Sequence, residues 1–369
     1  MNRESTNNKK EPVPSRGIAS KERLYSIEFF RIYFILVIFI GHVLSLFPDY
    51  DLSIFGLRLN GFTFGIHFFF IVGGFFLYRR VISGTPAFEL IKKTWLRLVP
   101  GMLFAFSFFV FLNKSRIEQL PSVLFLTGGT GISTPPMGFA DWFFGAYFWM
   151  SCFFIGLFQL PRKYAFLILG VVSYFIASFL VHAVTVNPKN GFFMDTYYSV
   201  IGYHFGRGLL CMGVGMVAAF LSENIQLPKR FPGRIIGTAA EILCLIAVFR
   251  FSVYTNHSRM TQPEIIMTLA LLILFCSQSW GYISAGLNSI RWVQLFSRYV
   301  FSCLIGHIIM HRWLAMHGYF DLSLGWRICA CIVCSVCVGV LEYHLIERWL
   351  VPMLARYFFP KKVPSLLNN

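Results

Sequence analysis

The feature that most constrains this chain is a series of apolar runs, each about 20 residues long. As helices, such runs can cross the roughly 30 Å hydrocarbon layer of a bilayer. Only 13% of the 369 residues are charged, whereas a soluble domain carries about a quarter. The runs therefore predict an all-α, polytopic membrane protein with about ten transmembrane helices. We place them near residues 27–47, 62–78, 96–112, 142–160, 164–183, 200–221, 235–254, 263–280, 297–316 and 325–345.

The basic residues predict how these spans are oriented. If the N-terminus is cytoplasmic, most of the 32 Lys and Arg residues fall on the inner side, as the positive-inside rule requires. An even number of spans then places both termini in the cytoplasm. We divide the chain into a polar basic tail (1–24), a transmembrane domain (25–350) and a short cytoplasmic tail (351–369), in the cytoplasmic (inner) membrane. The net charge of +16 is thus attributed to topology and anionic lipid, and no nucleic-acid partner is expected.

Cysteines and histidines with regular spacing raise the question of a disulfide or metal site. All nine cysteines lie in or beside apolar runs, where we interpret them as small apolar fillers. His307 and His311 are one helical turn apart, which is a metal-ligand spacing. Because no carboxylate lies near them in their span, we predict no metal.

The stretch RIYFILVIFIGH, residues 31–42, has an arginine and a histidine at the two ends of an apolar run. Eleven helical steps turn through about 1100°, so Arg31 and His42 should share a face, about 16 Å apart along the axis. Ionisable groups within a span usually mark function. The alternatives are a snorkelling anchor at Arg31 and a hydrogen-bonded packing residue at His42. Glu28, one turn before Arg31, is expected to pair with it.

Residues 26–42, SIEFFRIYFILVIFIGH, resemble the first span of the membrane acyltransferase-3 family, whose pattern is a basic residue, ten residues and then His. Residues 65–77, GIHFFFIVGGFFL, resemble its second span, with Gly73 in place of a serine before Gly74. Residues 92–100, KKTWLRLVP, resemble its basic third-span start. Residues 141–149, 300–307 and 344–350 resemble further family motifs, which include Ser302, His307 and Glu347.

The resemblance implies transfer of an acyl group, usually acetyl, from cytoplasmic acyl-CoA to a carbohydrate hydroxyl. Acyl-CoA would be a co-substrate, with no permanently bound cofactor. The catalytic residues would be His42, as the general base, and Glu28 in the same motif. The cations expected to bind the CoA phosphates are Arg31, Arg97, Lys93, Arg79 and Arg80. The candidates for acceptor binding or oxyanion stabilisation are His67, Asp141, Trp142, Tyr147, Ser302 and His307.

Two other classes of protein are compatible with the span pattern. A transporter or flippase could use an intramembrane Arg and His as a proton relay, but we find no clear internal repeat that would favour it. A channel-like or structural subunit leaves the Arg-His pair unexplained. The sequence identifies neither the oligomeric state nor the acceptor: lipopolysaccharide O-antigen, exopolysaccharide, a lipid-linked sugar and a peptide antibiotic all fit.

Overall fold

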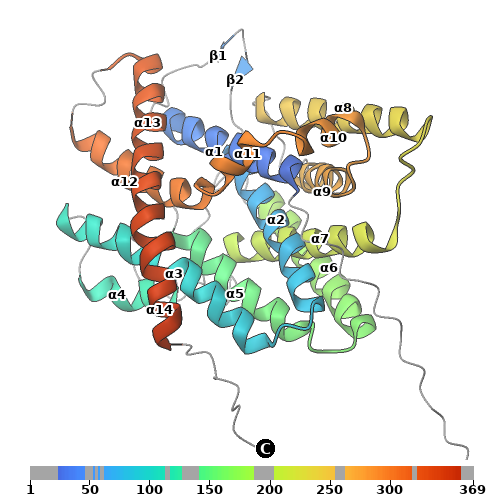
Figure 1. The fold of residues 1–369 in the computed structure, drawn as a ribbon, viewed down its shortest axis with the longest axis horizontal. Coiled ribbons are helices and arrows are strands. Elements are labelled where there is room, and N and C mark those ends of the chain that lie inside the picture. The colour runs from blue at the N-terminus through green and yellow to red at the C-terminus, as the bar shows by residue number, and fades with distance from the viewer. Residues whose placement is uncertain are drawn as a thin grey trace, which may run out of the picture.

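The computed structural model describes residues 24–45, 53–54, 57–58, 62–112, 117–126, 141–186, 203–253, 262–317 and 322–358. These residues are almost entirely helical (Figure 1). The only sheet among them pairs two antiparallel strands of two residues each, β1 (Ser53–Ile54) and β2 (Leu57–Arg58). The described residues thus confirm the predicted all-α class.

Each predicted apolar run coincides with one long helix in the described part of the chain. These helices are α1 (Tyr25–Ser45), α2 (Phe62–Ile82), α3 (Ala87–Phe111), α5 (Asp141–Leu157), α6 (Arg162–Val186), α7 (Tyr203–Asn224), α8 (Gly233–Val253), α9 (Gln262–Gln278), α12 (Val300–Met316) and α13 (Leu324–Glu342). Shorter elements connect or extend them: η1 (Ile117–Gln119), α4 (Leu120–Phe125), α10 (Tyr282–Asn288), α11 (Trp292–Ser297), η5 (Tyr343–Leu350) and α14 (Val351–Phe358).

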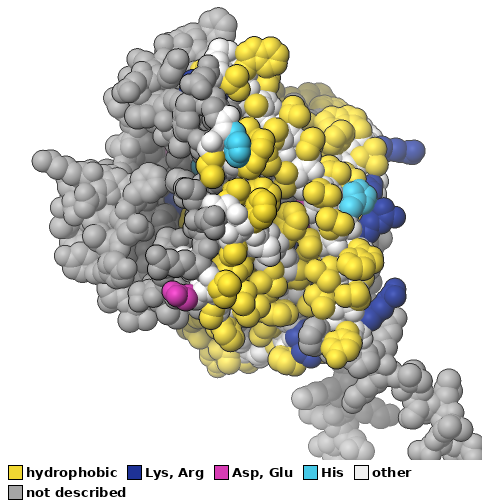
Figure 2. Space-filling model, turned by 90° about the vertical axis from the view of Figure 1, so that its left-hand side faces the viewer, with side chains coloured by type: hydrophobic (Ala, Val, Ile, Leu, Met, Phe, Trp, Pro, Cys, Tyr) yellow, Lys and Arg dark blue, Asp and Glu magenta, His cyan; other side chains and the backbone are white. Residues whose placement is uncertain are grey.

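Five helices among the described residues are long and apolar enough to cross a membrane. They lie within Tyr25–Val43, Phe64–Ile82, Ala87–Phe111, Phe205–Asn224 and Leu324–Tyr357, and the bent pair α9 and α10 would make a sixth. Figure 2 shows a face covered mainly by hydrophobic side chains, with Lys and Arg along one edge, as a lipid-facing surface requires. The chain is therefore a membrane protein, while ten crossings and two cytoplasmic termini stay predictions.

Helix α1 is the central element of the bundle. It contacts α2, α9, α10, α11, α12 and α13, and Figure 1 shows it between α13 and α9. Bulky apolar side chains occur on every side of this helix, and Phe34, Ile38 and Phe39 are almost fully buried. Arg31 and His42 are both partly buried on this helix.

Helices α2 and α7 approach each other closely through glycine. A Cβ atom at Gly74 would collide with the carbonyl oxygen of Met212, and one at Gly215 would collide with that of Ile71. Small residues allow helix backbones in a membrane to come into direct contact. Gly74, known from sequence only as a motif residue, is thus a packing residue between α2 and α7.

A buried carboxylate caps the bend between α9 and α10. Glu241 on α8 accepts hydrogen bonds from the backbone N–H groups of Gly281 (2.9 Å), Ile283 (3.2 Å) and Ser284 (3.3 Å), and from the Ser284 hydroxyl (2.5 Å). These N–H groups belong to the start of α10 and have no partner within that helix. The carboxyl group thus provides acceptors for backbone groups that α10 itself leaves unsatisfied.

Helices α13, η5 and α14 form one continuous helix on one side of the bundle (Figure 1). Leu324–Tyr357, the candidate membrane span within it, has 34 residues and is therefore about 50 Å long. Its middle segment, η5, is a π-helix, in which the Val351 N–H donates to the carbonyl of Ile346. The boundary we predicted at residue 350 falls inside this helix.

Candidate active site

Arg31 is held by the acidic residue one turn before it. Its Nη1 donates to both carboxylate oxygens of Glu28, at 3.1 and 2.8 Å. Both side chains are mostly buried, with 16% and 18% of their surfaces exposed. The pairing expected from the sequence is present, and it fixes the guanidinium at one end of α1.

Two further arginines lie near Arg31. Arg80, at the end of α2, is within electrostatic range of both Arg97 on α3 and Arg31. Arg97 and Arg31 are also within range of the carboxylate of Glu347 on η5. Arg97 additionally lies over the ring of Phe301, with its Cζ 5.1 Å from the ring centroid. Arg31, Arg80 and Arg97 form what we call the arginine cluster, in which three cations face the carboxylates of Glu28 and Glu347.

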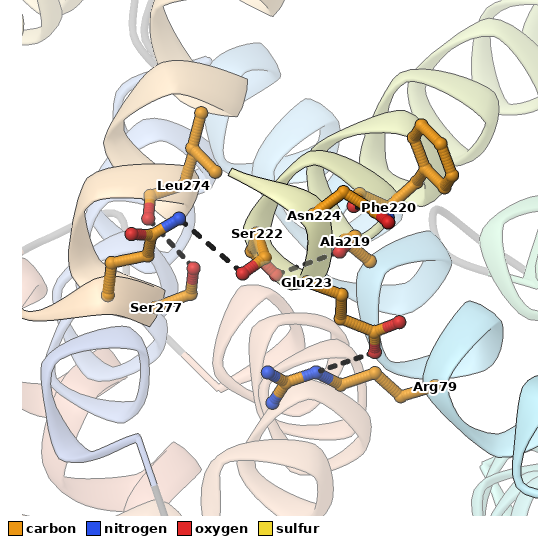
Figure 3. A network of polar contacts seen from close by, with 9 residues as sticks. Arg79, Ala219, Phe220, Ser222, Glu223, Asn224, Leu274 and Ser277 are labelled. Carbon is orange, nitrogen blue, oxygen red and sulfur yellow. Dashed lines mark hydrogen bonds and ion pairs between the residues drawn. The ribbon is translucent and has the colours of Figure 1, made fainter. Parts of the chain in front are cut away.

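The other two predicted donor cations have partners elsewhere. The Nε of Arg79 is 3.8 Å from Glu223 Oε1 at the end of α7 (Figure 3). The Nζ of Lys93 is 2.6 Å from Glu89, and both side chains are more than half exposed. The structure thus brings together three of the five predicted cations.

His42 lies beside a second histidine at the other end of α1. Its ring centroid is 5.2 Å from that of His307 on α12, and Phe39 stacks on His307 at 5.0 Å. His307 is 2% exposed, and its Nδ1 lies 2.5 Å from the carbonyl oxygen of Leu304. Because a carbonyl only accepts, Nδ1 must carry the hydrogen, which leaves Nε2 of a neutral ring as a proton acceptor. Two motifs far apart in sequence therefore meet at this histidine pair.

A separate buried group includes His67 on α2. His67 is fully buried, and neither ring nitrogen has a hydrogen-bond partner of good geometry. The charge of Arg207 on α7 reaches this ring, and the Arg207 Cζ lies 5.4 Å from the ring centroid of Trp142 on α5. Arg207 is only 1% exposed. Its place inside the predicted apolar run 200–221 was a sequence signal of burial, but Arg207 was not among the predicted site residues.

The remaining acceptor candidates lie in different places. Tyr147 packs on Gly73, where a Cβ would approach a ring carbon to 2.5 Å. Asp141 begins α5, and its side chain lies outside the described residues. Ser302 does not lie at the histidine pair, because its hydroxyl donates to Glu347 Oε1 at 2.9 Å, next to the arginine cluster.

A fully buried carboxylate beside Ser302 was missed from the sequence. Glu342 is 0% exposed, at the junction of α13 and η5. Its only sequence signal was a carboxylate inside the apolar run 325–345. Within the described residues, no group of three or more His, Cys, Asp or Glu side chains could hold a metal ion.

The family comparison bears directly on these motifs. A family model described as an acyltransferase domain matches residues 24–344, which include both the arginine cluster and the histidine pair. The chain belongs to the acyltransferase-3 family. No curated protein and no solved structure matches it. As a member of this family, the protein is a membrane O-acyltransferase.

Proposed function

We propose that this acyltransferase transfers an acyl group, in the simplest case acetyl, from cytoplasmic acyl-CoA to a hydroxyl of a cell-surface or lipid-linked carbohydrate. One observation carries the proposal: the arginine cluster and the histidine pair lie at opposite ends of α1. CoA has its phosphates and its thioester at opposite ends of a long molecule. The separation of about 16 Å between Arg31 and His42 is comparable to the reach of an extended pantetheine arm.

The arginine cluster suits the phosphates of the donor. Arginine forms forked, charge-assisted hydrogen bonds with phosphate oxygens. Three cations against two carboxylates leave an excess of positive charge for a polyanion. Arg79 and Lys93, which pair with Glu223 and Glu89, would add long-range attraction rather than direct contacts.

The histidine pair suits the chemical step. Neutral His42 would take the proton of the acceptor hydroxyl as its oxygen attacks the thioester carbonyl. Collapse of the tetrahedral intermediate breaks the carbon–sulfur bond, and the CoA thiolate leaves with that proton as CoA–SH. His307, fixed by its hydrogen bond to Leu304, would keep the neighbouring imidazole in position. Trp142 on α5 offers a ring on which a sugar could stack.

Radiolabelled acetyl-CoA tests the proposal. Membranes that contain the protein should move label from acetyl-CoA into a glycan fraction, and membranes without it should not. The matched control is the His42→Gln variant, expressed to the same level. If the purified protein neither hydrolyses acetyl-CoA nor transfers its acetyl group to any acceptor, while it moves a glycan across vesicles, it is a transporter and the proposal is wrong.

A further inference from the structure

The continuous C-terminal helix turns two carboxylates toward the same place. Glu342 and Glu347 are five residues apart, which in an α-helix would direct them about 140° apart. The segment between them is the π-helix η5, whose i→i+5 hydrogen bonding places residues five apart above one another. A π-helix is rare and often occurs at functional sites. Here it brings both carboxyl groups to Ser302 on α12.

The Ser302 hydroxyl has one proton to give. It gives that proton to Glu347 Oε1, at 2.9 Å. The carboxyl group of Glu342 lies near this hydroxyl, but among the described residues no group donates a hydrogen bond to either of its oxygens. Toward Glu342, Ser302 can therefore only accept, and an ionised carboxylate has no hydrogen to donate.

The described neighbours of Glu342 give an anion little support. Glu342 is 0% exposed, and Gly101 on α3 is so close that a Cβ there would lie 2.8 Å from Glu342 Oε1. Its other neighbours include Cys303 and the like charge of Glu347. An unpartnered carboxylate in such surroundings is strongly disfavoured over the neutral acid. The neutral acid can donate to Ser302 and so satisfy both groups.

Glu241 provides a contrast within the same protein. It is just as buried, at 1% exposed, but it accepts hydrogen bonds from three backbone N–H groups and the Ser284 hydroxyl. The two buried glutamates thus differ in their surroundings, because donors converge on Glu241 and none of the described groups donates to Glu342. Glutamine can replace a neutral acid as a donor, but it cannot replace a carboxylate that only accepts.

We propose that Glu342 is a positioning residue of the donor site and that it acts as a neutral acid. Its hydroxyl donates to Ser302, Ser302 donates to Glu347, and the Glu347 carboxylate holds Arg97 and Arg31 in the geometry that binds the CoA phosphates. The inference rests on the proposed use of the arginine cluster for acyl-CoA. It assigns to η5 the role of aligning the two carboxyl groups on one hydroxyl.

Four variants of the full-length protein test this role, with CoA binding measured by calorimetry and transfer measured with acetyl-CoA. Glu342→Gln keeps a donor and should leave the Kd for CoA within about twofold of the unsubstituted protein. Glu342→Leu and Ser302→Ala interrupt the chain and should each weaken CoA binding about tenfold. In these two variants KM for acetyl-CoA should also rise, while kcat at saturating acetyl-CoA should stay near the value of the unsubstituted protein. The double variant, which combines Glu342→Leu with Ser302→Ala, should bind CoA no more weakly than either single variant, because both changes interrupt the same chain of hydrogen bonds.

Glu241→Gln is the matched control for replacing a buried glutamate. It should lower thermal stability without changing the Kd for CoA, because Glu241 caps α10 and lies outside the donor site. Fluorescence-detected size-exclusion chromatography reports whether each variant folds. If Glu342→Leu does not fold, the comparison of Glu342→Gln with Ser302→Ala decides.

Three results would overturn the inference. If Glu342→Gln weakens CoA binding as much as Glu342→Leu and Ser302→Ala do, Glu342 acts as an anion. Unchanged CoA affinity in all of these variants would mean that it positions nothing. Failure of the unsubstituted protein to bind CoA would remove the proposed function, and this inference with it.

Discussion

At the scale of single residues, the division of α1 into a binding end and a chemical end makes the two roles separable. At one end of α1, Arg31 is held by Glu28. At the other end, about three helical turns from Arg31, His42 lies against His307. A substitution at the arginine end should therefore mainly weaken CoA binding, and a substitution at the histidine end should mainly slow acyl transfer.

Replacing His42 by Gln should abolish transfer while leaving CoA binding intact. Glutamine keeps hydrogen-bonding capacity but cannot accept a proton at neutral pH. Loss of a general base typically reduces the rate by about 10²–10⁴-fold. Initial rates with labelled acetyl-CoA measure the loss, and calorimetry measures the affinity. His317→Gln, an exposed histidine stacked on Trp313 on the same helix as His307, is the control and should be fully active.

Replacing Arg97 by Ala should weaken CoA binding. Each charge-assisted hydrogen bond lost from the donor site should reduce the binding free energy by on the order of 1.5–3 kcal/mol. Arg31→Ala should do the same and should also leave Glu28 without its partner. Lys163→Ala removes a cation that lies over Tyr164, away from the cluster, and should have no effect. Unchanged affinity in both arginine variants would contradict the assignment of the cluster.

Sequence reasoning found the ends of the site but not its internal connections. Helical periodicity was enough to relate Arg31 to His42, and one-turn spacing was enough to pair Glu28 with Arg31. Arg79 and Lys93 look equivalent to Arg80 and Arg97 in sequence, because only tertiary packing reveals Glu223 as the partner of Arg79. Glu342 could not be connected with Glu347, because nothing in the sequence predicts a π-helix between them.

At the scale of helices, the tightest constraint is the contact of α2 with α7. Replacing Gly74 by Ala would force its Cβ into the backbone of α7 at Met212, where no side-chain rotation can relieve the collision. We expect a loss of about 1–3 kcal/mol in stability, as for other overpacked positions. Thermal unfolding in detergent measures it. Gly170→Ala on α6 is the control, since a Cβ there meets nothing within 4 Å, and it should be neutral.

The helices themselves were largely predictable, because each apolar run of membrane length became a helix at nearly the same residues. The departures occur where hydropathy carries no signal. The run predicted to end at residue 280 breaks at Gln278, where Ser279 adopts a positive φ of 51° and α10 continues at a bend of 62°. The last run was predicted to end at residue 345, but YHLIERWL continues the helix as η5 despite its polar residues.

At the scale of the whole molecule, the arginine cluster bears on the topology. The beginning of α1, the end of α2, the first half of α3 and the segment η5 all contribute to one site. The beginning of α1, the end of α2 and the first half of α3 lie on the same side of the membrane only if consecutive helices cross it in opposite directions. The distribution of basic residues predicts the same alternation.

Cysteine labelling from outside intact cells tests this arrangement. Lys10→Cys and Ser365→Cys should gain no label from a membrane-impermeant thiol reagent, relative to the unsubstituted chain. Ser53→Cys, in the connection between α1 and α2, should gain label and serves as the positive control. An external signal from residue 10 or 365 would refute two cytoplasmic termini.

The continuous helix Leu324–Tyr357 has a consequence for the lipid around it. At a length of about 50 Å and even at the steepest tilt common for membrane helices, about 40°, it extends over nearly 40 Å of the membrane normal. This exceeds the hydrocarbon thickness of about 30 Å, so the polar, amphipathic end of the helix, η5 and α14, extends out of the hydrocarbon layer, and the tilt of the helix sets how far. A change of tilt would move Glu347 relative to Arg97. Reconstitution into short-chain and long-chain lipids should therefore change the Kd for CoA, which would make the enzyme responsive to membrane thickness.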